Sequence, residues 1–162
     1  MNRWALIVLA ACSLAAGCGD DNPSAPSAGP LVFSAILSPA NEVPAIGNAE
    51  SGGRGAAQIT FSGGTAGFYF QVTGFTGDTR VVGAHIHPGA AGVNGPVIIG
   101  TPLSAGAPFL LSNGGGEYRV SGITVDPAML QAIINNPAGF YFNVHSPLNP
   151  GGFARGQLTR IQ

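Results

Sequence analysis

Three histidines are the residues of this chain best suited to chemistry, and each lies where a strand-like apolar run meets a turn. His85 and His87 stand in residues 80–96, a segment that begins apolar and ends in glycine, asparagine and proline. His145 ends a second run of this kind, which begins at Phe140. Side chains two positions apart in a strand point to the same face, so His85 and His87 are expected side by side.

Two hypotheses follow from this placement. If a neighbouring strand brings His145 beside the pair, the three imidazoles form a ligand set that suits copper or zinc. Glu42 would then be a fourth ligand or a hydrogen-bond partner of a ligand. Alternatively, the histidines bond the backbone of the loops that follow them and pin two long turns. The side chains expected to join the imidazoles in that polar network are Asn94, Asn143, Asn149, Arg155 and Gln157.

Other catalytic chemistry finds little support in the sequence. No serine stands in a strand-turn-helix motif, and no second carboxylate lies near Glu42 in the sequence. The arginines of the separate runs are expected at solvated strand ends: Arg80, Arg119, Arg155 and Arg160. We therefore expect a non-catalytic binding or structural module and no enzyme, with copper or zinc binding as the alternative.

Composition points to a turn-rich folded domain without a nucleic-acid partner. Charged residues make up 8% of the chain, none of them is lysine, and the net charge is −1. Nucleic-acid binding rewards clustered positive charge, which this chain lacks. Its 26 glycines and 13 prolines would suit disorder, but 45% of the residues are hydrophobic and nine are phenylalanine. Alternating apolar runs of this kind favour a packed β domain.

The N-terminus has the pattern of a bacterial lipoprotein leader. An apolar run over residues 4–14 follows Arg3 and is shorter than the roughly 20 residues that span a bilayer. It ends in Leu14-Ala-Ala-Gly-Cys18, which resembles a lipobox. We expect a signal peptide over residues 1–17, lipidation at Cys18, a flexible tether over residues 18–30 and a domain over residues 31–162.

The expected protein is therefore exported and lipid-anchored to the bacterial cell envelope, at the outer membrane, in the periplasm or on the cell surface. Its membrane contact would be the N-terminal lipid, and the sequence identifies no protein partner. Removal of residues 1–17 would also remove Cys12 and leave one cysteine, so no internal disulfide is expected.

Alternating runs and turn signals predict the fold class. In residues 66–75, Phe68 and Phe70 fall on one face while Tyr69 and Gln71 fall on the other, the period of an antiparallel strand with one wet side. Residues 117–125 are expected to alternate in the same way, with Ile123 on the face of Arg119 and opposite Tyr118. Many such runs predict an all-β fold, an antiparallel β-sandwich or barrel.

One short crossover helix is expected to interrupt the strands. Asp126 can cap the first turn, and Pro127 suits the first helical position. Met129, Leu130 and Ile133 recur at helical spacing, and Pro137 ends the pattern. We expect this helix to pack on the sheet and to take no part in a site.

Three motifs, taken in order, resemble the CHRD domain, a module repeated in chordin and found singly in many bacterial exported proteins. They are Ala35-Ile-Leu-Ser-Pro-Ala-Asn-Glu-Val-Pro44, then Gly83-Ala-His-Ile-His-Pro-Gly89 with Gly92-Val-Asn-Gly-Pro-Val97, then Phe140-Tyr-Phe-Asn-Val-His145 through Asn149-Pro-Gly-Gly-Phe-Ala-Arg-Gly-Gln-Leu158. The resemblance covers residues 31–161 and implies an all-β fold, whereas it leaves the activity of bacterial members undefined. The sequence departs from the family pattern at Ala45 and Ala154, which argues against a catalytic carboxylate beside Arg155.

The His-X-His spacing is also similar to that of copper–zinc superoxide dismutase. This chain has neither a fourth histidine nor, once processed, a cysteine pair. A redox enzyme at the histidines is therefore the third and least favoured hypothesis, and no dismutase is expected.

Overall fold

The structure, a computed structural model, describes residues 29–162. The expected signal peptide over residues 1–17 and Cys18 lie outside the described residues. So does the expected tether over residues 18–30, except for Gly29 and Pro30, which belong to no helix or strand. Within the described part of the chain, no helix is long and apolar enough to cross a membrane.

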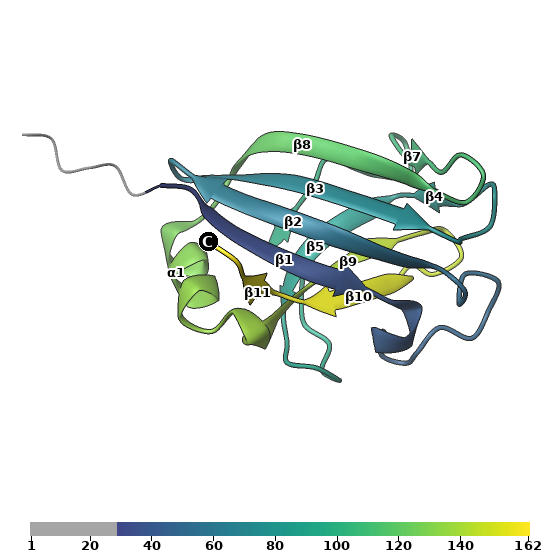
Figure 1. Ribbon diagram of the computed structural model, residues 1–162, viewed down its shortest axis with the longest axis horizontal. Helices are drawn as coiled ribbons and strands as arrows, with labels where there is room; N and C mark the ends of the chain where they lie inside the picture. Colours follow the sequence, from purple (N-terminus) through teal and green to yellow (C-terminus); the bar gives the residue numbers. More distant parts are fainter. Residues whose placement is uncertain (1–28) are drawn as a thin grey trace, which may run out of the picture.

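The predicted all-β sandwich is confirmed, since two antiparallel sheets pack face to face (Figure 1). The larger sheet has the strand order β11-β1-β2-β3-β8. Its strands are β1 (Leu31–Leu37), β2 (Arg54–Ser62), β3 (Thr65–Thr73), β8 (Gly116–Thr124) and β11 (Thr159–Arg160). A tight turn at Gly63 and Gly64 joins β2 to β3, and both glycines have positive φ, as a two-residue hairpin turn requires.

The smaller sheet has the order β10-β9-β5-β6. Its strands are β5 (Gly83–Pro88), β6 (Ile99–Gly100), β9 (Phe140–His145) and β10 (Ala154–Gln157). A two-stranded ribbon of β4 (Arg80–Val81) and β7 (Phe109–Leu110) accompanies the two sheets. Two short 3-10 turns complete the set, η1 (Pro39–Asn41) and η2 (Pro137–Gly139).

The C-terminal run, expected as one strand over residues 153–161, divides between the two sheets. Strand β10 pairs with β9, whereas β11 pairs with β1 of the other sheet. The change of sheet falls at Leu158, which is buried in the core. A bridge between Ser38, just after β1, and Arg155 of β10 also joins the sheets. The residues after β1 are thereby held beside the smaller sheet.

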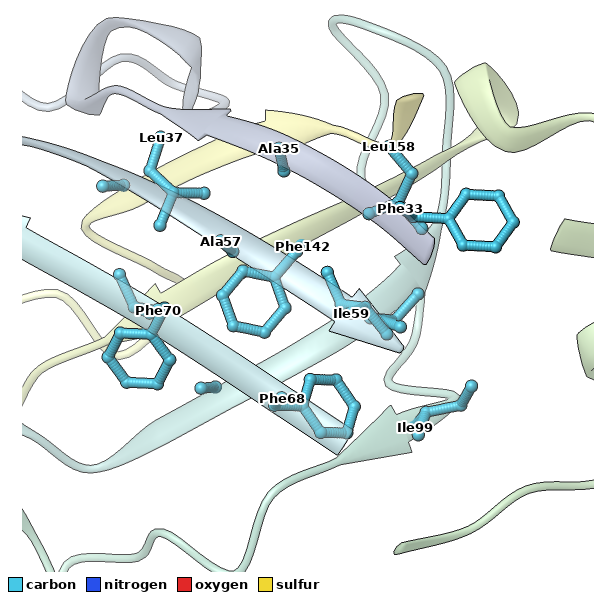
Figure 2. Close-up of a cluster of buried hydrophobic side chains, with 14 of the residues drawn as sticks. Phe33, Ala35, Leu37, Ala57, Ile59, Phe68, Phe70, Ile99, Phe142 and Leu158 are labelled. Carbon is cyan, nitrogen blue, oxygen red and sulfur yellow. The ribbon is translucent and has the colours of Figure 1, made fainter. Parts of the chain in front are cut away.

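The core lies between the sheets and is built from the apolar positions of the alternating runs. Figure 2 shows Ile59 and Phe68 from the larger sheet directed toward Phe142 of β9. The rings of Phe68 and Phe142 stack with their centroids 6.0 Å apart. Residues of this cluster are almost fully buried, so their packing supplies the main stabilising term.

Strand β8 departs from the predicted alternation. Ile123 was expected on the face of Arg119, but it packs against the core as Tyr118 and Val120 do. The cause is a bulge at Gly122, whose φ is +80°, where the register with β3 shifts. One extra residue in a strand reverses the side-chain alternation beyond it.

The predicted helix is α1 (Pro127–Asn135), which lies at one end of the sandwich (Figure 1). The Asp126 carboxylate accepts hydrogen bonds from the backbone N–H groups of Ala128 and Met129, as expected of an N-cap. Ile133 is buried in the core, which fixes the helix on the sheets.

Candidate functional site

His85 and His87 stand on the outer face of the smaller sheet, which is turned away from the core. Ala84 and Ile86 alternate with them along β5 and pack inside. The two imidazoles therefore share one face, with ring centroids 5.7 Å apart. The expected pairing of these side chains follows from strand geometry alone.

The neighbouring strand β9 supplies the third imidazole. Gly83 pairs with His145 in antiparallel register and His85 pairs with Asn143, so the two histidines stand diagonally across the strands. A Cβ on Gly83 would lie 2.7 Å from Cε1 of His85, so the glycine leaves the space that this ring fills. One ring nitrogen from each of the three histidines lies within 4.8 Å of the other two.

Hydrogen bonds to loop carbonyls hold two of the imidazoles. His87 donates from Nδ1 to the carbonyl of Gly95, and His145 donates from Nδ1 to that of Pro150, both at 2.9 Å. A neutral imidazole has one donor and one acceptor nitrogen, so Nε2 of each ring carries a lone pair. Nε2 of His145 lies 3.0 Å from Nδ1 of His85. Nε2 of His87 is buried and has no hydrogen-bond partner among residues 29–162.

The environment keeps all three rings in the neutral form that can bind a metal. Burial, together with smaller effects of the neighbouring His145 and His87, lowers the pKa of His85 to about 4. Burial also lowers the pKa of His87 and that of His145, although the loop carbonyls act in the opposite direction. At neutral pH a metal would therefore meet little competition from protons.

Asn143 lies at the centre of this face and is 1% exposed. Its Oδ1 atom is 2.9 Å from Nε2 of His145, and its Nδ2 atom donates a long bond of 3.4 Å to the carbonyl of Gly151. The amide also lies near His87 without forming a hydrogen bond to its Nε2. Asn143 is therefore the polar side chain that touches the histidine cluster most directly.

Arg155 is buried, contrary to the expectation that it would be a solvated strand end. It is 1% exposed, because loops cover the outer face of β10. Its guanidinium donates to the carbonyls of Asn41 and Val93 and to Oδ1 of Asn94. The Glu42 carboxylate lies 3.9 Å from its Nε. A carboxylate does stand beside Arg155, although it comes from a segment more than a hundred residues away.

Glu42 shares this buried environment but is not close enough to the histidines to bind the same ion. Among the described residues, the group of side chains that could hold a metal consists of His85, His87 and His145. Burial raises the pKa of Glu42 to about 7, against the opposing charge of Arg155. Its Oε1 atom has no hydrogen-bond partner among the described residues. The geometry places Glu42 behind Asn143 rather than at the imidazoles.

Asn149 and Gln157 also fix loops by hydrogen bonds. Among the described residues, neither side chain hydrogen-bonds an imidazole. Gln157 donates to the carbonyls of Gly89, Ala138 and Phe140. Asn149 donates to the Glu50 carboxylate and pairs with Asn48. The side chains expected in a single network therefore divide into separate groups over the same sheet face.

Two important residues escaped the sequence reasoning. Glu50 is 3% exposed and accepts hydrogen bonds from Ser146, Asn149 and Thr79, so it anchors the loop that carries the Pro150 carbonyl. Tyr141 is 3% exposed and stacks on His87. Burial of Glu50 has no sequence signal, since the residue lies within the glycine-rich segment of residues 47–55. The place of Tyr141, two residues before Asn143, could have been inferred from strand periodicity.

A pocket of about 350 Å³ opens between residues 42–48 and residues 148–152, next to Asn94, and no histidine lines it. Glu42 and Gly152 lie in its lining. Two larger hollows of about 480 Å³ lie on the outer face of the larger sheet, and no histidine lines them. We assign the candidate site to the histidine face, because the ligand-forming side chains converge there.

Comparison with known proteins places this arrangement in a family. The family model of the CHRD domain matches residues 33–158, which include all three histidines. No curated protein matches the chain.

Proposed function

Because this chain belongs to the CHRD domain family, which is not a known enzyme family, we propose that it is a non-catalytic module that binds one copper or zinc ion through His85, His87 and His145. The observation that carries the proposal is the orientation of the rings. Two of them give their Nδ1–H to loop carbonyls and keep the Nε2 lone pair for another partner. Metal-bound histidines are oriented by such a bond from the second nitrogen.

The unpaired Nε2 of His87 supports the same proposal. A buried acceptor without a partner costs about 1–3 kcal/mol. A bound ion would remove that cost. The ligand nitrogens lie within 4.8 Å of one another, so they need to approach to about 4 Å or less to form bonds of about 2.0 Å to one ion.

The test uses the full-length chain, purified in mild detergent without a polyhistidine tag and stripped of metal. Copper(II) and zinc(II) are titrated calorimetrically, and thermal unfolding is followed with and without each ion. We expect one ion per chain and a higher melting temperature, since an ion bound only by the folded state at 100 times its Kd stabilises by about 2.7 kcal/mol.

The matched variants are His87→Ala, His85→Gln and the exposed control Gln58→Ala. Both histidine variants should lose at least tenfold in affinity, and the control should not. His85→Gln guards against misfolding, because His85 is the least buried of the three rings. Equal binding in the wild type and both histidine variants would contradict the proposal. A less stable His87→Ala protein, with no metal effect in the wild type, would leave the imidazoles as purely structural pins of the loops.

We also propose that the protein is exported and held on the bacterial envelope by a lipid on Cys18. The support is the order of an apolar run, a lipobox-like Leu14-Ala-Ala-Gly-Cys18 and a stretch free of large apolar residues before the domain. A palmitate analogue supplied to expressing cells should label the wild type and not Cys18→Ser. Equal labelling of both proteins would exclude this residue as the lipid site.

A further inference from the structure

The hydrogen bonds around Asn143 leave two acceptors facing each other. Nε2 of His145 carries a lone pair because Nδ1 of the same ring donates to Pro150. The atom of Asn143 that faces it, at 2.9 Å, is the carbonyl oxygen Oδ1, which is also an acceptor. An N–H on His85 Nδ1 can donate to Nε2 of His145. It makes no hydrogen bond to Asn143, so Oδ1 of Asn143 still faces an acceptor.

The opposite orientation of the amide meets the same difficulty elsewhere. The Nδ2 atom of Asn143 donates to the Gly151 carbonyl, so a flipped amide would place Oδ1 against that oxygen. Nδ2 of Asn143 and the Glu42 carboxylate also lie side by side against Gly152, in the space that a Cβ on this glycine would occupy. The surroundings therefore keep the NH2 group on the Glu42 side and the oxygen on the histidine side.

Distances among these atoms match a right-angled set of ligands. Two ligands that are each about 2.05 Å from an ion stand about 2.9 Å apart at 90° and about 3.3 Å apart at the tetrahedral angle. The separation from His145 Nε2 to Asn143 Oδ1 is 2.9 Å, and that to His85 Nδ1 is 3.0 Å. Right angles between nitrogen and oxygen ligands are typical of tetragonal copper(II), whereas zinc prefers the tetrahedron.

Building on the three-histidine site proposed above, we propose that Asn143 Oδ1 is a fourth ligand and that the centre is selective for copper(II). A cation bound by Asn143 Oδ1, His145 Nε2 and His85 Nδ1 would accept a lone pair from each of these atoms. The contact between the two acceptors Oδ1 and His145 Nε2 would then become two bonds to the same ion. The hard amide oxygen favours copper(II) over copper(I), and nitrogen and oxygen ligands bind copper(II) more tightly than zinc(II) in general.

The experiment compares copper(II) binding by the full-length wild type with that of Asn143→Asp and Asn143→Leu, in the same detergent. Asn135→Asp is the control, because it adds the same charge at an exposed position of α1. We expect Asn143→Asp to bind at least as tightly as the wild type, Asn143→Leu to bind 10–100-fold more weakly, and the control to be unchanged. The copper(II) electron paramagnetic resonance spectrum should be axial in the wild type and altered in both Asn143 variants.

A measurement on the wild type removes the dependence on variants that fail to fold. In a crystal of the copper-loaded protein, we expect the copper to lie within about 2.5 Å of Asn143 Oδ1, and zinc to be displaced by copper(II) in competition. A copper–Oδ1 distance beyond about 3 Å, or unchanged spectra in both Asn143 variants, would overturn the fourth ligand while leaving the histidine site intact. A wild type that takes up no copper(II) would overturn both proposals.

Discussion

The imidazole of His87 lies parallel to the ring of Tyr141, with an interplanar angle of 1° and 4.8 Å between the ring centroids. The guanidinium of Arg155 lies 4.2 Å from the centroid of the same ring. Since β9 runs between β5 and β10, Tyr141 separates a candidate ligand from a buried cation. Its hydroxyl also accepts the N–H of Gly95, whose carbonyl accepts Nδ1 of His87. Tyr141 thus orients His87 both by stacking and through the loop.

Graded substitution of Tyr141 should separate these two contributions. Tyr141→Phe keeps the stack and loses the bond to Gly95, so copper(II) affinity should fall only a few-fold. Tyr141→Leu loses both and should cost at least tenfold in affinity, as do losses of groups that orient metal ligands. Calorimetric titration measures each value. Wild-type affinity in Tyr141→Leu would show that the stack does not orient His87.

The histidines should make stability depend on pH below neutrality. Because the pKa of folded His85 is about 4 and the ordinary value is 6.5, the unfolded chain binds more protons between these two pH values. The free energy of unfolding contributed by His85 is therefore present above pH 6.5 and is lost as the pH falls toward 4. The lowered pKa values of His87 and His145 act in the same direction.

Urea unfolding of the wild type and His85→Gln at pH 7 and pH 4.5 measures the contribution of His85. Between pH 7 and pH 4.5, the free energy of unfolding of the wild type should fall by on the order of 1–2 kcal/mol more than that of His85→Gln. This figure is below the full effect of the shift, because the ring is partly exposed and solvent screens it. A difference that does not vary with pH would contradict the lowered pKa.

Glu42 should act in the opposite direction. Its folded-state pKa of about 7 lies above its ordinary 4.5, so the folded protein binds the additional proton between these values. The stability that the protonated carboxyl contributes is present below pH 4.5 and is lost as the pH rises through 7. Glu42→Gln resembles the protonated form and keeps its stability at high pH. Its free energy of unfolding minus that of the wild type should therefore rise by on the order of 2 kcal/mol as the pH is raised from 5 to 8. Urea unfolding measures this, and the exposed Asp78→Asn serves as the control.

Loss of the Glu50 carboxylate should affect both stability and the site. Glu50→Ala leaves hydroxyl and amide groups of Ser146 and Asn149 buried without their acceptor, which should cost on the order of 3 kcal/mol. The loop they anchor carries the Pro150 carbonyl that orients His145. Copper(II) affinity should therefore fall together with the melting temperature. Unchanged affinity in a folded Glu50→Ala protein would show that this loop does not position the ring.

The bulge in β8 should be sensitive to substitution through the backbone alone. A Cβ on Gly122 would touch nothing within 4 Å, but its φ of +80° is unfavourable for other residues. Gly122→Ala should lose about 1 kcal/mol in chemical unfolding. Gly67→Ala is the matched control, because its Cβ would make only ordinary contacts, at 3.7 Å. Equal stability of the two variants would mean that the bulge relaxes without strain.

Local pattern was enough to predict much of the fold. The alternation of Phe68 and Phe70 with polar neighbours identified the inward face of β3, and Asp126 identified the start of α1. Prediction failed where the chain breaks its own period. Gly122 inserts a residue into β8 and moves Ile123 to the core face, and Leu158 marks a change of sheet inside one continuous run.

The sequence by itself determined that His85 and His87 share a face, because their spacing of two matches the period of a strand. Tertiary structure alone decided that His145 and Asn143 join them, since strand pairing sets which distant residues become neighbours. It also decided that Arg155 and Glu50 are buried. Loops that cover the outer face of the smaller sheet exclude water from positions where periodicity indicates a solvated side. Such coverage depends on long-range packing, and no local pattern in the chain records it.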